Sequence, residues 1–138
     1  MPVAFTAAET IDAPPARVWA ALTDFEQAHR WMGDVTFVDA SVPIEVGTEL
    51  RFETRGKTIT TQVVGYAAER SLVLRSTQGP VTAEYAYALA PDGAGTRVTL
   101  EATCEARGFA ALFGWLIRGA IRKTDGGQVA ALKALVAS

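Results

Sequence analysis

Apolar and polar residues alternate most regularly in two neighbouring segments, residues 81–89 and 96–105. The apolar positions are Val81, Ala83, Tyr85, Tyr87 and Leu89 in the first segment, and Val98, Leu100, Ala102 and Cys104 in the second. The positions between them hold mainly Thr, Glu and Arg. Successive side chains of a strand point to opposite faces, and an antiparallel sheet can face water on one side. The pattern therefore predicts two strands of a sheet with one apolar and one polar face.

Shorter runs of the same kind predict five further strands. We expect seven strands in all, at residues 3–11, 35–42, 48–54, 58–66, 71–77, 81–89 and 96–105. Turn residues separate the last six, among them Pro43, Gly47, Gly56 and the segment 91–95, Pro-Asp-Gly-Ala-Gly. Consecutive strands with short turns are typical of an antiparallel meander.

Two short helices are predicted between the first strand and the second. The first covers residues 14–22 and starts at a Pro-Pro pair, which the first turn of a helix tolerates. Its apolar residues Val18, Trp19 and Leu22 share one face. The second runs from Phe25 to Trp31, and Gly33 is its expected stop.

The C-terminal region has helical periodicity. Its apolar stripe consists of Phe109, Leu112, Phe113, Leu116 and Ala120, followed by Val129, Leu132 and Val136. One helix over residues 109–136 would be about 40 Å long. Each residue of the pair Gly126-Gly127 costs roughly 1 kcal/mol relative to alanine inside a helix. Either the pair breaks the helix, or it allows close approach of another backbone or a ligand.

Size and composition favour a single α+β domain over residues 1–138. The 138 residues suffice for one hydrophobic core, and 49% of them are hydrophobic. The formal net charge of −2 and the scattered Lys and Arg residues argue against nucleic acid as a partner.

Compartment and cofactor expectations follow from what the sequence lacks. Residues 1–5 show no signal-peptide pattern, and the longest apolar stretch, residues 109–117, is too short to span a bilayer. Cys104 is the only cysteine and His29 the only histidine. We expect a cytoplasmic protein without an integral membrane segment, a metal site or a cofactor.

The order of elements resembles a known superfamily. The resemblance is carried by segments 11–25, 46–50, 91–98 and 132–135 together with Trp31. In these features the chain is similar to the START-related helix-grip superfamily (SRPBCC), within it the polyketide cyclase/dehydrase and lipid-transport branch. The resemblance implies a seven-stranded curved antiparallel sheet wrapped around a long C-terminal helix, with two short helices after strand 1. It also implies a cavity between sheet and helix, although fold alone does not establish function.

Candidate ligand-binding residues are those expected between the sheet and the helix. They are Trp31, Phe37, Phe52, Leu74, Tyr85, Tyr87, Leu100, Cys104, Leu112, Trp115 and Leu116. The alternative is that these side chains form a solid core, because aromatic residues dominate packing in any domain. Tyr85 and Tyr87 are the most specific pair, since a buried phenol needs a hydrogen-bond partner, either in a ligand or on a neighbouring strand.

No residue set forms a catalytic signature. His29 is interpreted as a surface residue with a functional role as the alternative, and Cys104 as a small buried apolar side chain. Arg118 either lies on a solvated flank or reaches the cavity mouth to bind a carboxylate or a phosphate. Whether the protein turns over a substrate therefore stays open.

Three functions remain compatible with the sequence. The first is binding of a small hydrophobic or aromatic molecule in the cavity. The second is a polyketide cyclase- or dehydratase-like enzyme acting on a small carbonyl compound. The third is a module that docks on a protein or a membrane surface without a ligand. The ligand, the pathway and the oligomeric state are not determined, and a homodimer is left open.

Overall fold

The computed structural model describes residues 2–32, 35–40, 44–54 and 56–137. In chain order its elements are β1 (Val3–Ile11), α1 (Pro15–Thr23), the 3-10 helix η1 (Phe25–Arg30), β2 (Thr36–Ala40), β3 (Glu49–Thr54), β4 (Lys57–Ala67), β5 (Ser71–Gln78), β6 (Val81–Asp92), β7 (Gly95–Ala106), the 3-10 helix η2 (Gly108–Phe113), α2 (Gly114–Asp125) and α3 (Gln128–Ala137). The expected Gly33 stop of the second short helix lies outside the described residues. The predicted order of strands and helices is confirmed.

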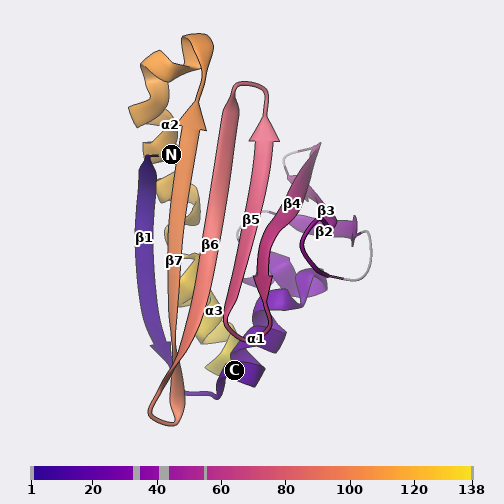
Figure 1. The fold of residues 1–138 in the computed structure, drawn as a ribbon, viewed down its shortest axis with the longest axis vertical. Coiled ribbons are helices and arrows are strands. Elements are labelled where there is room, and N and C mark those ends of the chain that lie inside the picture. The colour runs from indigo at the N-terminus through magenta and orange to yellow at the C-terminus, as the bar shows by residue number, and fades with distance from the viewer. Residues whose placement is uncertain (1, 33–34, 41–43, 55, 138) are drawn as a thin grey trace.

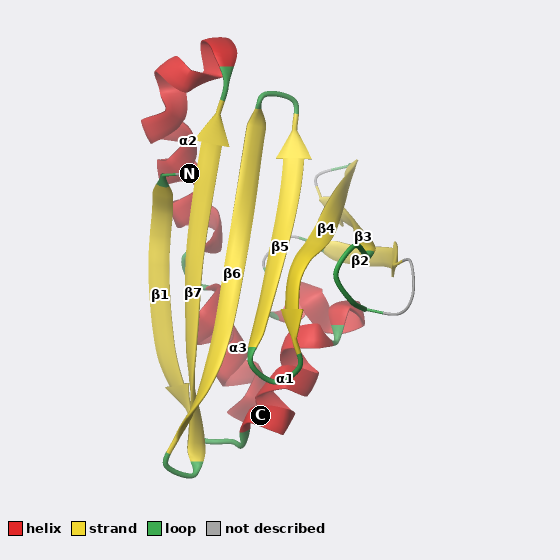
Figure 2. Cartoon of the chain, in the orientation of Figure 1, coloured by secondary structure: helices red, strands yellow, loops and turns green. Residues whose placement is uncertain are grey.

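The strands form one antiparallel sheet of seven, in the order β1-β7-β6-β5-β4-β3-β2, within the described part of the chain. Neighbouring strands from β2 to β7 are consecutive in sequence. The β1 strand pairs with β7 and forms the edge of the sheet opposite β2. The sheet is curved, and the helices cover one of its faces (Figures 1 and 2). The predicted helix-grip architecture is therefore confirmed.

The alternation of β6 and β7 produces the two faces predicted for them. Tyr87 and Leu89 of β6 are buried opposite Leu100 and Val98 of β7. The intervening position Glu101 is exposed. The apolar face lies under the helices and forms the core, which gains about 25 cal/mol for each Å² of apolar surface removed from water.

The α1 helix fastens the covering layer to the sheet. Pro15 stands in its first turn, and its face of Val18, Trp19 and Leu22 is buried as predicted. The ring of Trp19 packs edge-on against Tyr66 of β4, with 5.6 Å between ring centroids. This ring contact attaches α1 to the sheet at β4.

The C-terminal helical segment is interrupted at Gly126-Gly127. The amide N–H of Gly126 donates to the carbonyl of Arg122 at 2.9 Å, which ends α2, and α3 begins two residues later at Gln128. A Cβ atom on Gly126 would lie 2.5 Å from that same carbonyl oxygen. Of the two interpretations of the glycine pair, the helix break is the one found.

The expectation that the whole apolar stripe faces the sheet is wrong for its first part. In α3 the stripe is buried, with Val129, Leu132 and Val136 in the core. In η2 and α2, however, Phe109, Leu112, Phe113 and Leu116 are exposed.

The physical reason is the face that α2 presents to β1 and β7. Its packed residues are Gly114, Ile117, Arg118 and Ile121, which recur at helical spacing and are buried or half-buried. Adjacent helix positions differ by about 100° in direction. The stripe through Leu116 is therefore turned away from the sheet, and the break at Gly126 uncouples it from the buried stripe of α3.

Candidate functional site

A pocket of about 170 Å³ lies between the apolar face of the sheet and the junction of α2 with α3. It is half-open to solvent. Its lining residues are Met32, Val35, Phe52, Ile59, Thr61, Leu74, Ser76, Gln78, Tyr85, Tyr87, Asp125 and Gln128. The strands contribute the apolar Phe52, Ile59 and Leu74, the two tyrosines and the polar Thr61, Ser76 and Gln78, and the helix junction contributes Asp125 and Gln128. The pocket thus has an apolar wall and a polar end.

Four of the candidate residues meet at this pocket. Phe52 of β3 and Leu74 of β5 form part of the apolar wall, and Tyr85 and Tyr87 of β6 reach the polar end. Their strand phase explains this placement, because Leu74 pairs directly with Tyr85 in the β5–β6 ladder. Directly paired residues of antiparallel strands lie side by side on the same face.

The polar end is a hydrogen-bonded set of four side chains. The Tyr85 hydroxyl donates to Oδ2 of Asp125, and the Tyr87 hydroxyl donates to Oε1 of Gln128 at 2.6 Å. Nε2 of Gln128 donates to Oδ1 of Asp125 at 3.3 Å. The set joins β6 to the end of α2 and the start of α3, so the helix break positions the polar groups of the pocket.

Burial changes the acidity of this set. Desolvation raises the pKa of the Asp125 carboxyl, although the hydrogen bonds from Tyr85 and Gln128 oppose the shift. Desolvation also raises the pKa of Tyr85 and of Tyr87, and the nearby Asp125 charge raises both further. The two phenols therefore stay protonated and act as donors, and Asp125 accepts the Tyr85 hydrogen bond in a partly apolar setting.

Asp125 and Gln128 were not among the sequence candidates. Both stand beside Gly126-Gly127, and the three-residue spacing would place them on one face of a continuous helix. The signal that could have found them is the glycine pair, because polar residues on either side of a helix break can point into the space that it opens.

The other strand candidates lie outside the 170 Å³ pocket. Leu100 and Cys104 lie in the core, and burial raises the pKa of the Cys104 thiol while Arg118 partly offsets the rise. The half-buried Phe37 packs against Phe52, with 5.8 Å between ring centroids. Burial with a raised pKa agrees with the interpretation of Cys104 as a small apolar side chain.

Three helix candidates lie away from the pocket. Leu112, Trp115 and Leu116 are between 51% and 67% exposed, so the expectation that they face inward is wrong. As described above, α2 packs through Gly114 and Ile117 instead, and this rotation carries the three side chains to the outside.

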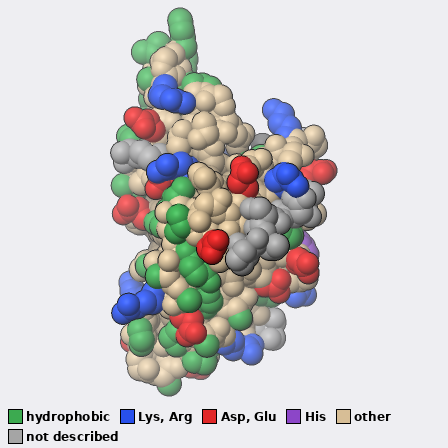
Figure 3. Space-filling view, turned by 45° about the vertical axis from the view of Figure 1, so that its right-hand side comes forward, with side chains coloured by type: hydrophobic (Ala, Val, Ile, Leu, Met, Phe, Trp, Pro, Cys, Tyr) green, Lys and Arg blue, Asp and Glu red, His purple; other side chains and the backbone are tan. Residues whose placement is uncertain are grey.

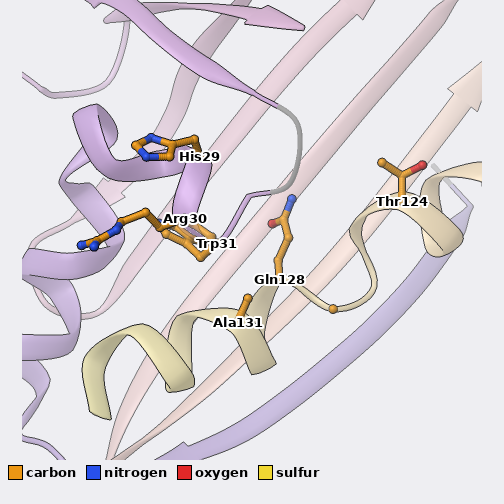
Figure 4. A pocket seen from close by; sticks show the side chains of 7 residues that line it. His29, Arg30, Trp31, Thr124, Gln128 and Ala131 are labelled. Carbon is orange, nitrogen blue, oxygen red and sulfur yellow. The ribbon is translucent and has the colours of Figure 1, made fainter. Parts of the chain in front are cut away.

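A second hollow of about 270 Å³ lies between η1 and the α2–α3 junction. Its lining residues are His29, Arg30, Trp31, Thr124, Gly127, Gln128 and Ala131 (Figure 4). The side chains of His29 and Arg30 extend away from Gln128 and Thr124, and both are exposed. The preferred interpretation of His29 as a surface residue is therefore consistent with its position.

Trp31 lines the second hollow and contacts Tyr87, which lines the first. Its ring is buried and packs edge-on against Tyr87, with 5.8 Å between ring centroids. Its indole Nε1 is buried without a hydrogen-bond partner, a state that costs free energy in a core. Trp31 therefore supports Tyr87 by ring packing alone.

Residues 2–32, 35–40, 44–54 and 56–137 contain no group of three or more His, Cys, Asp or Glu side chains able to hold a metal ion. No helix within these ranges has the length and apolar character needed to cross a bilayer.

Comparison with known proteins identifies the family. The model of the family described as "Polyketide cyclase / dehydrase and lipid transport" matches residues 2–137. No curated protein matches the chain in sequence.

Solved structures show the same fold. The crystal structure of Ara h 8.0201 has a TM-score of 0.73 at 14% identity, covering 96% of both chains. TTHA0849 from Thermus thermophilus has a TM-score of 0.70 at 22% identity, covering 96% of this chain and 95% of the other.

DynU16, a protein in the dynemicin biosynthetic locus, has a TM-score of 0.67 at 19% identity. There the match covers 96% of this chain and 46% of the other. At these identities the similarity concerns the fold. With the family match over nearly its whole length, this chain belongs to the polyketide cyclase/dehydrase and lipid-transport branch of the START-related helix-grip superfamily.

Proposed function

We propose that the protein binds a small, neutral, largely apolar molecule in the pocket between the sheet and the α2–α3 junction. The observation that carries the proposal is the pocket itself, with an apolar wall and a hydrogen-bonded polar end. Ligand sites in proteins commonly combine an apolar lining with a few placed polar groups.

The pocket volume sets the size of the ligand. An apolar cavity of about 150 Å³ accommodates benzene, and this pocket measures about 170 Å³. The ligand therefore has the size of one aromatic ring with a short substituent. The ring would contact Phe52 and Leu74, and its burial would supply most of the affinity.

The polar end sets the ligand's functional group. Asp125 accepts hydrogen bonds from Tyr85 and Gln128, and its pKa is already raised by desolvation. A second carboxylate placed beside it would be repelled, whereas a hydroxyl group could donate to Asp125 or to the Tyr85 oxygen. We expect binding in the order benzyl alcohol, then toluene, then benzoate.

The test is isothermal titration of these three compounds into the protein. We expect saturable binding of benzyl alcohol that is lost in Ser76→Phe, because this substitution fills the pocket from β5. The matched control is Thr77→Phe, one residue along the same strand and exposed on the opposite face. Equal binding by both variants, or no binding of benzyl alcohol to the unaltered protein, would refute the proposal.

A second candidate function is proton transfer on a small carbonyl compound. The observation that favours it is the contact between the Tyr85 hydroxyl and the Asp125 carboxylate. A carboxylate with a raised pKa can accept a proton from the carbon next to a carbonyl, while the Tyr85 phenol moves its hydrogen bond from Asp125 to the developing enolate oxygen. Such a step precedes cyclisation by aldol chemistry.

This candidate is tested by hydrogen–deuterium exchange of the methyl protons of acetophenone in D₂O, followed by NMR. We expect catalysed exchange that is lost in Asp125→Asn and reduced in Tyr85→Phe. The control Glu84→Gln removes a carboxylate that pairs with Arg75 outside the pocket. Exchange at the uncatalysed rate, or unaffected exchange in Asp125→Asn, would leave binding as the function.

A further inference from the structure

Large apolar side chains are concentrated on one exposed segment. Seven such side chains are exposed among the described residues, and five of them lie within residues 109–116. They are Phe109 (86% exposed), Leu112 (67%), Phe113 (52%), Trp115 (66%) and Leu116 (51%), which together we call the apolar tip. Monomeric proteins rarely expose a large contiguous apolar surface unless it is an interaction site.

The apolar tip projects from one end of the molecule. It is formed by η2 and the first turn of α2, which stand at the upper end of the fold in Figure 1. The space-filling view shows hydrophobic side chains protruding at this end, with a Lys or Arg side chain directly below (Figure 3). A convex protrusion does not enclose a partner, but it can insert into a surface that deforms around it.

The charge of this segment is opposite to that of the whole chain. Residues 107–124 contain Arg107, Arg118, Arg122 and Lys123 and no Asp or Glu, whereas the chain as a whole has a net charge of −2. Arg118 is half-buried on the sheet-facing side of α2, where its guanidinium lies beside the buried Gly114. Arg107 is exposed and immediately precedes η2.

We propose that the apolar tip inserts into the interfacial region of an anionic lipid bilayer, with the exposed Arg107 contacting a lipid phosphate. Two observations support this partner: aromatic and aliphatic side chains share one exposed segment, and the nearest charged residue on either side of it along the chain is an arginine. Interfacial segments combine buried apolar area with attraction of basic residues to anionic lipids. Tryptophan is favoured at the boundary between headgroups and acyl chains.

A second copy of the chain is a poorer occupant of this surface. A two-fold symmetric contact places the same surface of both copies together. It would bring the exposed Arg107 of one copy toward the same cation of the other, and like charges in contact oppose association. The same positive charge attracts an anionic bilayer and opposes a symmetric dimer.

The chain contains its own spectroscopic probe for the test. Of its three tryptophans, Trp19 and Trp31 are buried and Trp115 is exposed in the apolar tip. The unaltered protein is titrated with vesicles of phosphatidylcholine containing phosphatidylglycerol, and with vesicles of phosphatidylcholine alone. We expect a blue shift of the emission with the anionic vesicles, weakened by added salt.

Two variants separate the apolar from the electrostatic contribution. Phe109→Ser combined with Leu112→Ser keeps Trp115 and should weaken binding to anionic vesicles by about tenfold or more. Arg107→Gln should weaken it and reduce its salt dependence. The matched control Val46→Ser replaces an apolar residue that is 61% exposed far along the chain from the apolar tip, and it should bind normally.

Thermal midpoints close to that of the unaltered protein show that the variants are folded. The proposal is overturned if anionic vesicles cause no blue shift, or if phosphatidylcholine alone binds equally well. It is also overturned if sedimentation shows a dimer whose Trp115 emission is already blue-shifted without vesicles, because a second copy then covers the apolar tip.

Discussion

The Tyr87 hydroxyl donates a hydrogen bond to Oε1 of Gln128 at 2.6 Å, across 41 positions of the chain. Both side chains are buried, and the bond connects the middle of β6 to the first residue of α3. Gln128 also donates to Asp125 on the other side of the helix break. One buried contact thus fixes where the C-terminal segment turns and where the polar end of the pocket lies.

Replacing Tyr87 by Phe should destabilise the protein by about 1–3 kcal/mol, because Oε1 of Gln128 would lose its donor while staying buried. The free energy of unfolding from urea titration is the measurement. The control is Tyr66→Phe, whose half-buried ring packs on Trp19 and is kept by the substitution. A loss in Tyr87→Phe no larger than in Tyr66→Phe would contradict the role given to the buried bond.

Asp125 should make the stability depend on pH in an unusual direction for a carboxyl group. Its folded-state pKa is raised above the unfolded value of about 3.9, so the penalty for ionising it in the folded protein is absent below that pH. As the pH rises from the unfolded to the folded pKa of Asp125, the free energy of unfolding falls, because ionising this carboxyl costs more in the folded protein than in the unfolded chain.

The Asp125→Asn variant removes this titration. The free energy of unfolding of the variant minus that of the unaltered protein should therefore increase with pH from about 3.9 upward until the folded pKa has been passed. Urea titrations at a series of acidic to neutral pH values measure it. A difference that stays constant, or one that falls with rising pH, would show that desolvation does not dominate at Asp125.

The two glycines of the helix break should respond differently to alanine. A Cβ atom added to Gly127 would have no other atom within 4 Å, so Gly127→Ala should leave stability unchanged or raise it by up to about 1 kcal/mol. Gly126→Ala should cost about 1 kcal/mol or more, because its Cβ would meet the Arg122 carbonyl at 2.5 Å. Thermal unfolding of the pair compares them directly; equal effects would argue against the close contact.

Two leucines of the same apolar stripe should have unequal effects on stability. Leu132 of α3 is fully buried, so Leu132→Ala should cost about 2–5 kcal/mol. Leu116 of α2 is 51% exposed, so Leu116→Ala should change stability by no more than about 0.5 kcal/mol. Chemical denaturation measures both. A large loss in Leu116→Ala would mean that α2 packs on the sheet through this stripe after all.

Local pattern was sufficient to predict the strands and the faces of β6 and β7. Tyr87 and Leu100 alternate with polar neighbours, and a period of two residues can only bury such a pattern on one face of a strand. The same reasoning placed Phe52, Leu74, Tyr85 and Tyr87 on the apolar face, and these four residues line the pocket. Each of these predictions depends on spacing within one strand.

Tertiary structure decided what spacing within one element cannot encode. The sequence shows that residues 109–120 have an apolar stripe, but the direction of that stripe depends on how α2 packs against β1 and β7. Packing through Gly114 turned Leu116 outward, and the break at Gly126 let α3 bury Leu132 independently. The meeting of Asp125 and Gln128 with Tyr85 and Tyr87 is equally non-local. By itself the sequence determined which residues share a face of a strand or helix. Only the docking of the broken helix on the sheet decided which of these faces are buried, because burial depends on contacts between segments that are distant in the chain.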